Sequence, residues 1–428
     1  MKVFDLRAES SAQSEAILSR RYFPDPKIVN QVATILAEVR QHRDRALIEF
    51  TERFDKTAMK SAELAVMEDE IETAMAQIDP AFLEALQAAR TNIQDFALSG
   101  MRKDWEKNNA QGAIVGERFD PFRRVGIYVP AGTAPLVSTA VMTVSLAKVA
   151  GVPEIAVTTP VGPGKTVNSG LLAALRLAGA TEIYKVGGAQ AVAALAFGTE
   201  TIQPVCKIFG PGNAYVTEAK RQVFGYVAID LMPGPSEILV IADHSAEPRW
   251  IAADLLAQAE HGQGSVICLI AINEELIERV QAEIAIQIES LKRKIFLSEV
   301  LEKNSFFVLA KSEEQAVRIA NEFAPEHLSL MTQNSEKLAK TITCAGAVFI
   351  GNFSPVAAGD FVAGPSHVLP TGGAGKSFGG LTVDQFQRRT SLIRYDREAL
   401  KKSVSIVSQF SAIEQLDAHG RSISIRFE

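Results

Sequence analysis

The sequence predicts an α/β fold with mostly parallel sheets, and two observations lead to this prediction. From residue 123 onward, short runs rich in β-branched residues alternate with Ala-rich helical segments. Such alternation is typical of βαβ units, whose parallel strands are covered by helices on both faces. The chain has 428 residues, of which 47% are hydrophobic and 22% charged, which is ordinary for a globular protein of two or three domains.

The expected elements follow in chain order. Residues 28–54 and 70–97 carry apolar side chains at three- and four-residue spacing, which predicts helices with an interruption at Pro80. The expected strands, which are short and apolar, span 125–129, 155–159, 183–186, 207–209, 238–241, 266–271, 306–309 and 348–350. Helical patterns between them cover 171–177, 192–196, 215–223 and 250–259, and further helices are expected at 384–389 and 399–413. The Pro-rich stretch 230–236 is expected to cross from one α/β unit to another.

Charge and cysteine content exclude several classes of function. The net charge of −6 gives no basic footprint for nucleic acid. The charged first residues do not resemble a signal peptide, and the apolar run 134–147 is too short and too rich in Ser and Thr to span a membrane. The three cysteines, Cys206, Cys268 and Cys344, form no CxxC pair. We therefore expect a protein of the reducing cytoplasm, without membrane or nucleic-acid partners.

A glycine-rich turn follows the strand expected at 207–209. The segment Gly210-Pro211-Gly212-Asn213 opens the next helix, where free N–H groups and the helix dipole favour an anion such as a pyrophosphate. The turn equally fits a plain strand-to-helix connection with Asn213 as the N-cap. No GxGxxG fingerprint follows any expected strand, so a dinucleotide would have to bind without it.

The helix expected at 250–259 has an apolar stripe that ends in polar residues. Ile251 and Leu255 begin the stripe, and its continuation falls on Gln258 and His261. Residues at i and i+3 share a helix face and can bind one metal ion together. The alternative is a hydrogen-bonded core histidine, since buried polar groups need partners.

Acidic and imidazole side chains also gather in two turns. Pro325 stops a helical pattern, so Glu326 and His327 lie at a helix-to-strand corner, where the pair can share proton transfer. A solvated polar corner is the alternative. Downstream, a Gly/Pro-rich segment holds Asp360 and His367.

Seven motifs, in order, resemble the histidinol dehydrogenase family over essentially the whole chain. They are RVGIYVPAG at 124–132, GGAQA at 187–191, KIFGPGN at 207–213, GPSEILV at 234–240, QAEH at 258–261, APEHL at 324–328 and HVLPT at 367–371. The resemblance implies an oxidoreductase that converts L-histidinol through L-histidinal to L-histidine with two NAD, in histidine biosynthesis. It also implies a homodimer with a shared active site and one Zn²⁺ per subunit.

The resemblance further implies two incomplete Rossmann-like domains with small helical terminal segments. An N-terminal arm would span 1–22. The first α/β domain would comprise 23–127 and 237–377, with most zinc ligands and the catalytic pair. The second, with the NAD contacts, would span 128–236, and 378–428 would reach the partner subunit.

The resemblance also assigns the site residues. Zinc would be bound by Gln258, His261, Asp360 and the partner's His419, and Glu326 and His327 would transfer protons. The NAD contacts would be Tyr128, Gln190 and Asn213. The substrate contacts form the largest set, which is Ser236, Gln258, His261, His327, Asp360, His367, Glu414 and His419.

Three other functions remain open from the sequence. A dehydrogenase of the same fold could act on another small alcohol, such as a sulfopropanediol, but Glu414 and His367 favour histidinol. Ser366 stands where an asparagine is expected, which departs from the family pattern. A zinc hydrolase using Glu326 would leave the NAD motifs without purpose, and a non-catalytic homologue is disfavoured because every candidate ligand is present.

Overall fold

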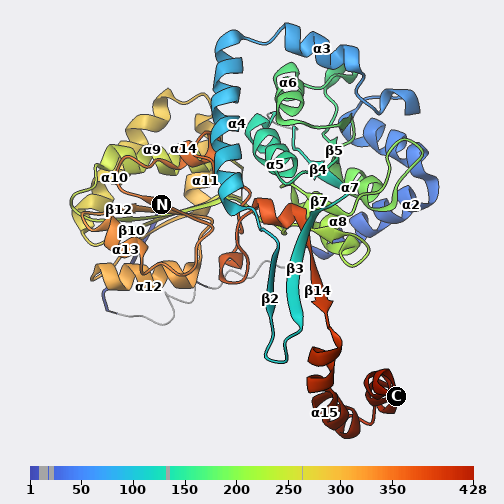
Figure 1. The fold of residues 1–428 in the computed structure, drawn as a ribbon. Coiled ribbons are helices and arrows are strands. Elements are labelled where there is room, and N and C mark those ends of the chain that lie inside the picture. The colour runs from blue at the N-terminus through green and yellow to red at the C-terminus, as the bar shows by residue number, and fades with distance from the viewer. Residues whose placement is uncertain (9–17, 19–23, 132–134, 263) are drawn as a thin grey trace.

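The structure is a computed structural model, and it describes residues 1–8, 18, 24–131, 135–262 and 264–428. Figure 1 shows two α/β units side by side, a small antiparallel sheet below them, and a C-terminal arm that extends away from both. No helix in the described ranges is long and apolar enough to cross a membrane.

The first unit is built on a six-stranded sheet in the order β1-β11-β10-β9-β12-β13, in which every pairing is parallel. Its strands are β1 (Lys2–Asp5), β9 (Glu237–Ala242), β10 (Val266–Ala271), β11 (Ser305–Leu309), β12 (His327–Met331) and β13 (Ala347–Ile350). Successive strand residues face opposite sides. In β9, Ile238 and Val240 join one hydrophobic core, and Leu239 and Ile241 join the other.

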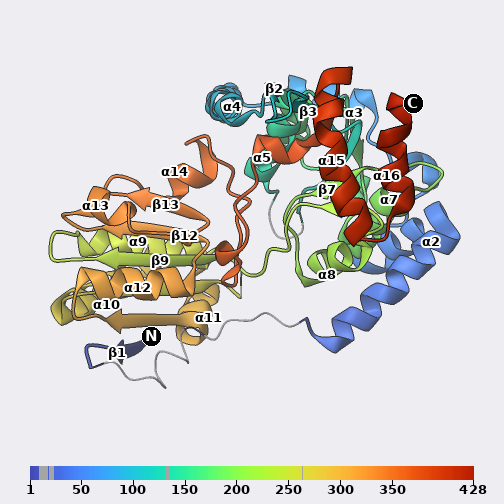
Figure 2. The same ribbon diagram turned by 60° about the horizontal axis from the view of Figure 1, so that its bottom comes forward.

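Helices cover both faces of this sheet (Figure 2). One core includes side chains of α9 (Pro248–Ala259), α10 (Glu274–Gln287) and α11 (Lys294–Asn304). The other includes α12 (Glu313–Phe323) and α13 (Ser335–Ala339), while α14 (Val356–Phe361) contacts α9. The buried faces explain the continuous apolar strands in the sequence.

The second unit has a five-stranded parallel sheet in the order β6-β5-β4-β7-β8. Its strands are β4 (Arg124–Tyr128), β5 (Glu154–Thr158), β6 (Glu182–Tyr184), β7 (Lys207–Phe209) and β8 (Ala228–Ile229). Helices α5 (Val137–Val149) and α6 (Ser169–Ala178) contribute to one core, and α7 (Gly188–Phe197) and α8 (Ala214–Val223) to the other. The sheet therefore reverses its strand order between β4 and β7, which in open α/β sheets is where ligands commonly bind.

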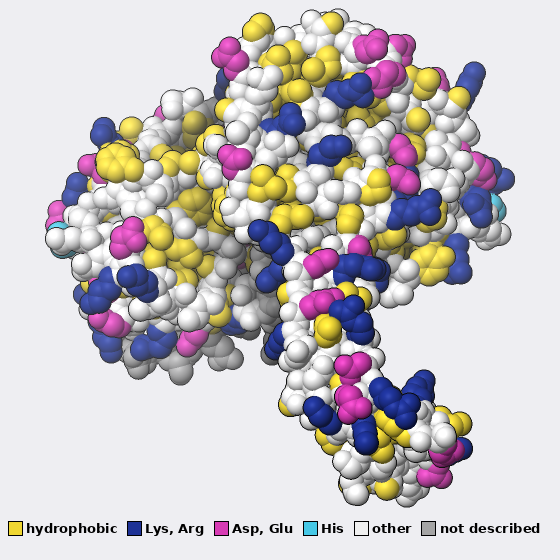
Figure 3. Space-filling view, in the orientation of Figure 1, with side chains coloured by type: hydrophobic (Ala, Val, Ile, Leu, Met, Phe, Trp, Pro, Cys, Tyr) yellow, Lys and Arg dark blue, Asp and Glu magenta, His cyan; other side chains and the backbone are white. Residues whose placement is uncertain are grey.

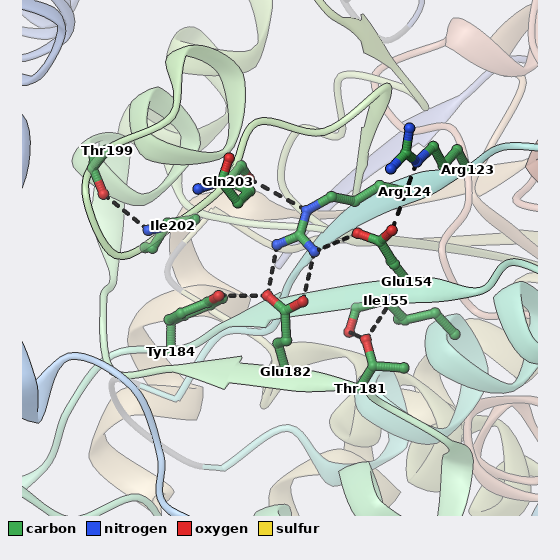
Figure 4. A network of polar contacts seen from close by, with 10 residues as sticks. All are labelled: Arg123, Arg124, Glu154, Ile155, Thr181, Glu182, Tyr184, Thr199, Ile202 and Gln203. Atoms are coloured by element: carbon green, nitrogen blue, oxygen red, sulfur yellow. Dashed lines mark hydrogen bonds and ion pairs between the residues drawn. The ribbon is translucent and has the colours of Figure 1, made fainter.

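A buried arginine joins three strands at the amino edge of the five-stranded sheet (Figure 4). Arg124 Nη1 donates to Glu154 Oε2 at 3.0 Å, and its Nη2 donates to Glu182 Oε2 at 2.6 Å. The Tyr184 hydroxyl donates to the same Glu182 carboxylate. These hydrogen bonds keep the guanidinium charged and raise the pKa of Arg124 against the opposing effect of burial. The network therefore fixes the amino ends of β4, β5 and β6.

The N-terminal helices are α2 (Pro26–Asp55), α3 (Glu68–Ala76) and α4 (Pro80–Gly100), which confirms the helices expected there and the interruption at Pro80. They pack mainly on the second unit, since α2 contacts α7 and α8, α3 contacts α6, and α4 contacts α5. The sequence-based domain assignment placed residues 23–127 in the first unit and started the second unit at residue 128. In the structure, the first strand of the second unit, β4, starts at Arg124. An amphipathic helix shows that it has a buried face, but its sequence does not say which sheet that face covers.

The prediction of a helix at 384–389 is wrong. Residues 387–394 form strand β14 (Gln387–Arg394), which pairs antiparallel with β3 (Ile114–Pro121), and β3 pairs with β2 (Trp105–Asn108). A mostly polar segment has little periodicity of its own, so pairing with a strand some 270 residues earlier decides its conformation. The short 3₁₀ segments are η1 (Ser61–Glu63), η2 (Pro163–Lys165), η3 (Ile288–Ser290), η4 (Ala374–Lys376), η5 (Val383–Phe386) and η6 (Ile425–Phe427).

Beyond β14, helices α15 (Arg397–Ile413) and α16 (Asp417–Ser424) pack against each other and form the arm. The arm stands away from both α/β units in Figure 1. At the other terminus, the arm expected at 1–22 begins with β1, which lies at the edge of the six-stranded sheet, and most of its remainder lies outside the described residues. The other expected strands and helices are present, and 230–236 connects β8 of one sheet to β9 of the other.

Candidate active site

Four polar residues meet at the amino edge of the six-stranded sheet. Glu237 begins β9 and Ser236 precedes it, while His327 begins β12, the strand beside β9, and Glu326 precedes it. Strand pairing brings these two segments together although about 90 residues separate them. His327 is only 2% exposed and Glu326 6%, so the solvated-corner alternative is wrong. The cluster lies at the edge opposite to the carboxyl edge at which open α/β sheets usually bind ligands.

The Glu326 carboxylate is fixed by two donors. Its Oε2 accepts from Ser236 Oγ at 2.5 Å and from the backbone N–H of Glu237 at 2.8 Å. Burial raises the pKa of Glu326, although His327 and the Ser236 hydroxyl act in the opposite direction. A carboxyl group held this way can exchange a proton closer to neutral pH than a solvated one.

The His327 ring is oriented by a backbone carbonyl. Its Nδ1 lies 2.9 Å from the carbonyl oxygen of Glu237, which can only accept, so Nδ1 carries a proton. In the neutral ring Nε2 then holds the lone pair. That nitrogen is buried, lacks a hydrogen-bond partner in the described structure, and lies 3.6 Å from Asp360 Oδ1. Burial alone would lower the pKa of His327, but the Glu326 and Asp360 carboxylates outweigh it and raise that pKa.

Gln258, His261 and Asp360 lie beside this pair. The Gln258 amide nitrogen donates to Ser236 Oγ, which leaves Gln258 Oε1 buried and without a partner in the described structure. His261 Nε2 lies 3.7 Å from Asp360 Oδ2. Burial would raise the pKa of Asp360, but its contacts with His261 and His327 hold that pKa well below its ordinary value. His261 lies two residues after the end of α9, and its side chain is 45% exposed, so it is not a buried core histidine.

His367 links this cluster to the other α/β unit. Its Nδ1 lies 3.0 Å from the backbone carbonyl of Asp360, and its Nε2 lies 3.1 Å from Thr139 Oγ1 on α5. Since the carbonyl accepts, Nδ1 donates and Nε2 accepts from the threonine hydroxyl. Burial lowers the pKa of His367, which favours this neutral form. Both ring nitrogens are therefore already hydrogen-bonded within the chain.

A hollow of about 400 Å³ opens next to the cluster. Its polar wall is His327, Asp360 and His367, and the opposite wall is mostly apolar, from β13, α14 and the loop after α14. His327 belongs to this wall. Its Nε2 has no hydrogen-bond partner in the described structure and holds the lone pair when the ring is neutral.

The three residues expected to contact NAD lie at the carboxyl edge of the five-stranded sheet. Tyr128 ends β4, Gln190 lies in the first turn of α7, and Asn213 precedes α8. The Tyr128 hydroxyl accepts from Gly188 N at 3.2 Å, and burial raises the pKa of Tyr128 to about 12, so the phenol is neutral. The Asn213 side chain accepts from the N–H groups of Tyr215 and Val216 and caps α8, which confirms the N-cap interpretation.

Two expected site residues lie elsewhere. Glu414 ends α15, and His419 is on α16, which packs on α15 in the arm. Within the described part of one chain, no three His, Cys, Asp or Glu side chains are arranged to hold a metal ion. A single chain therefore brings together Gln258, His261 and Asp360, but not His419.

Sequence analysis did not identify two residues of the cluster, Glu237 and Thr139. Glu237 acts through its backbone carbonyl, and because every residue has one, the residue type does not reveal this role. Thr139 could have been noticed in the sequence, because it is one of the hydroxyl residues that interrupt the apolar run 134–147. On α5 it is 2% exposed, and a buried hydroxyl needs a partner.

Together, the two parallel α/β units and the buried acid–imidazole pair beside a hollow define an α/β enzyme. Comparison with known proteins gives its class. The family model for histidinol dehydrogenase matches residues 18–427. The chain belongs to the histidinol dehydrogenase family and is an oxidoreductase.

Individual relatives agree with this assignment. The chain is 46% identical to a histidinol dehydrogenase of Geobacillus kaustophilus over 93% of both proteins, and 40% identical to one of Heliobacterium mobile over 98% of both. Among solved structures, the histidinol dehydrogenase of Elizabethkingia anophelis matches with a TM-score of 0.95 and 35% identity, over 100% of this chain and 98% of that one.

Proposed function

We propose that the protein oxidises L-histidinol through L-histidinal to L-histidine, with two NAD and one Zn²⁺ per subunit, in the cytoplasm. The observation that carries this proposal is the buried His327 Nε2, which has an available lone pair beside the Glu326 carboxyl group and a substrate-sized hollow. Family membership supports the substrate, because the relatives are named for it.

The first oxidation requires a base at the alcohol. A hydride leaves the carbinol carbon for NAD⁺ as the hydroxyl proton is removed, and His327 Nε2 is placed to take that proton. The ring stays oriented throughout because Nδ1 is bonded to the Glu237 carbonyl. The product of this step is the aldehyde.

The second oxidation requires water, because a hydride leaves readily only from the tetrahedral gem-diol. Glu326 is assigned as the base that takes a proton from the attacking water, and a second NAD⁺ accepts the hydride. Overall, one alcohol, one water and two NAD⁺ give one carboxylate, two NADH and three protons. No cysteine is assigned a role, since Cys268 is buried in β10 and Cys206 and Cys344 lie outside the cluster.

The residues at the cluster suit Zn²⁺. The buried Gln258 Oε1 lacks a partner among the described residues. With the His261 imidazole and the Asp360 carboxylate it offers nitrogen and oxygen donors of the kind that zinc binds. A fourth ligand would be His419 of the partner subunit. When bound, the ion would supply a template that orients an amino alcohol through its amine and imidazole.

We also infer a homodimer, for which the arm gives the structural argument. On α15, Phe410 is 63% exposed and Ile413 80%, and Ile393 on β14, shortly before the arm, is 71% exposed. Figure 3 shows hydrophobic surface on this arm, away from the body. Large exposed apolar side chains on a projecting element favour a protein partner. A second copy of this chain would cover them and bring Glu414 and His419 to a neighbouring site.

The test is an assay of the purified protein with L-histidinol and NAD. We expect two NADH per histidinol, loss of activity on chelation, and recovery with Zn²⁺. Turnover of a sulfopropanediol without turnover of histidinol would contradict the proposed substrate. Full activity of a metal-free preparation would contradict the zinc proposal.

A further inference from the structure

A buried ion pair lies directly beneath the glycine turn that follows β7. Lys220 on α8 and Asp230 after β8 are joined through Nζ and Oδ1, and both side chains are 0% exposed. Removing two charges from water is costly, and such pairs seldom persist for stability alone. The proposed chemistry at the six-stranded sheet uses neither residue.

Both members of the pair also bond to the same glycine. Lys220 Nζ donates to the carbonyl oxygen of Gly210 at 2.9 Å, and the N–H of Gly210 donates to Asp230 Oδ2 at 2.8 Å. The ion pair therefore fixes Gly210 through both its N–H group and its carbonyl group. A side chain at this position is excluded, because φ is +106° and a Cβ would lie 2.1 Å from the carbonyl oxygen of Tyr128.

These contacts fix the turn against its neighbours. Gly210 packs on the end of β4, and at the other end of the turn the Asn213 side chain caps α8. Between them, the N–H groups of Gly212 and Asn213 donate to no described residue. The turn lies between β4 and β7, where the sheet reverses its strand order.

We propose that Lys220 and Asp230 are positioning residues for NAD: they hold the Gly210–Asn213 turn so that the N–H groups of Gly212 and Asn213, which donate to no described residue, face the dinucleotide. This inference rests on the proposed function, since it takes NAD as the occupant of the turn. Neither side chain contacts the cofactor, because both are fully buried. Their effect passes through the backbone of Gly210.

The test compares the neutral double variant Lys220→Met/Asp230→Asn with the wild type. Changing both partners avoids an unpaired buried charge, which costs about 3–5 kcal/mol. The matched control is Arg124→Met/Glu182→Gln, which removes an ion pair between a buried arginine and a partly exposed glutamate at the opposite edge of the same sheet. Calorimetry gives the Kd of NAD and of histidinol for each protein, steady-state kinetics gives both KM values, and thermal unfolding checks folding.

For the Lys220/Asp230 variant we expect NAD to bind about tenfold more weakly or worse, with a matching rise in its KM, since about 1.4 kcal/mol is a factor of ten. Histidinol binding should stay within about twofold, and the control should lose stability without losing NAD affinity. An unchanged Kd of NAD in a folded Lys220/Asp230 variant would overturn the inference. So would an equal loss in the control.

If this double variant does not fold, Lys220→Gln/Asp230→Asn is the second variant, because it also leaves no buried charge unpaired and its amide groups can still hydrogen-bond to Gly210 while the ion pair is lost. An intermediate loss of NAD affinity is expected, and wild-type affinity would overturn the inference. Failure of the proposed function looks different: wild-type protein would then neither bind NAD nor reduce it with histidinol.

Discussion

Thr139 Oγ1 lies 3.1 Å from His367 Nε2, and this hydrogen bond joins the two α/β units at the candidate site. Thr139 is on α5 of the five-stranded unit, while His367 also bonds to the backbone of Asp360 beside the six-stranded sheet. The imidazole is neutral and partly buried, and the threonine hydroxyl donates to its second nitrogen.

We predict that Thr139→Val lowers kcat/KM for histidinol about tenfold, because a buried acceptor left without a donor costs about 1–3 kcal/mol. The control is Thr143→Val, one turn further on, whose hydroxyl donates to the Thr139 carbonyl and does not contact His367. Both variants should lose some stability in thermal unfolding. Equal kinetic losses in the two variants would show that the His367 contact has no special role.

Substitutions of His327 and Glu326 should slow different steps of the reaction. We expect His327→Asn to slow oxidation of both histidinol and histidinal, since its Nε2 is the proposed base for each hydride transfer. Glu326→Gln should mainly slow oxidation of histidinal, by about 10²–10⁴-fold, the usual contribution of a general base. Single-turnover assays started from either substrate distinguish the steps. Equal damage to both steps by Glu326→Gln would contradict this division.

The shared site predicts complementation between two inactive variants. His261→Ala and His419→Ala are each expected to lose activity, because each removes a proposed zinc ligand. In a mixed dimer, one of the two sites would combine intact His261 with the partner's intact His419. Subunit exchange in equal proportions should therefore restore about a quarter of wild-type activity, as expected for random twofold assembly. Absence of recovery in verified mixed dimers would disprove the sharing.

Stability should depend on pH through Asp55, the last residue of α2. Burial raises the pKa of Asp55 to about 6, and its Oδ2 is buried without a partner in the described structure. The folded state then binds this proton more tightly than the unfolded state, so the stability from Asp55 is fully present below pH 4. It is lost as the pH rises through about 6.

Asp55→Asn removes this titration. Relative to the variant, the wild type should become less stable between about pH 4 and 7, by about 1 kcal/mol once the partial solvent exposure of the carboxyl is allowed for. Urea unfolding of both proteins at pH 4.5 and pH 7.5 measures the change. A difference between the proteins that is the same at both pH values would contradict the predicted burial effect.

The parallel strands were predictable from the sequence because their residues face a core on both sides and appear as short apolar runs. Segment β14 was not, since Gln387–Arg394 is mostly polar and becomes a strand only through pairing with β3. The sequence also did not predict which sheet α2 covers, because this depends on its contacts with α7 and α8.

At the site, residue types that carry chemistry could be found in the sequence, but their geometry could not. Strand order brings Ser236 next to Glu326, and no local pattern encodes that neighbour relationship. The role of the Glu237 carbonyl is equally invisible, because every residue has one. His419 is the opposite case: it was found by resemblance, and a single chain does not bring it to the other proposed ligands.

Because the catalytic pair lies at the amino edge of the six-stranded sheet, the carboxyl end of β9 is far from the reacting atoms. Strand β9 runs six residues from Glu237 to Ala242, so the exposed His244 beyond it is about 20 Å from the cluster. The loop after β9 can therefore accept a fluorophore, a purification tag or a surface tether without reaching the reacting atoms, whereas the loop after β13 lines the hollow. The enzyme is thus suited to immobilisation by that end, with its working face left open to solution.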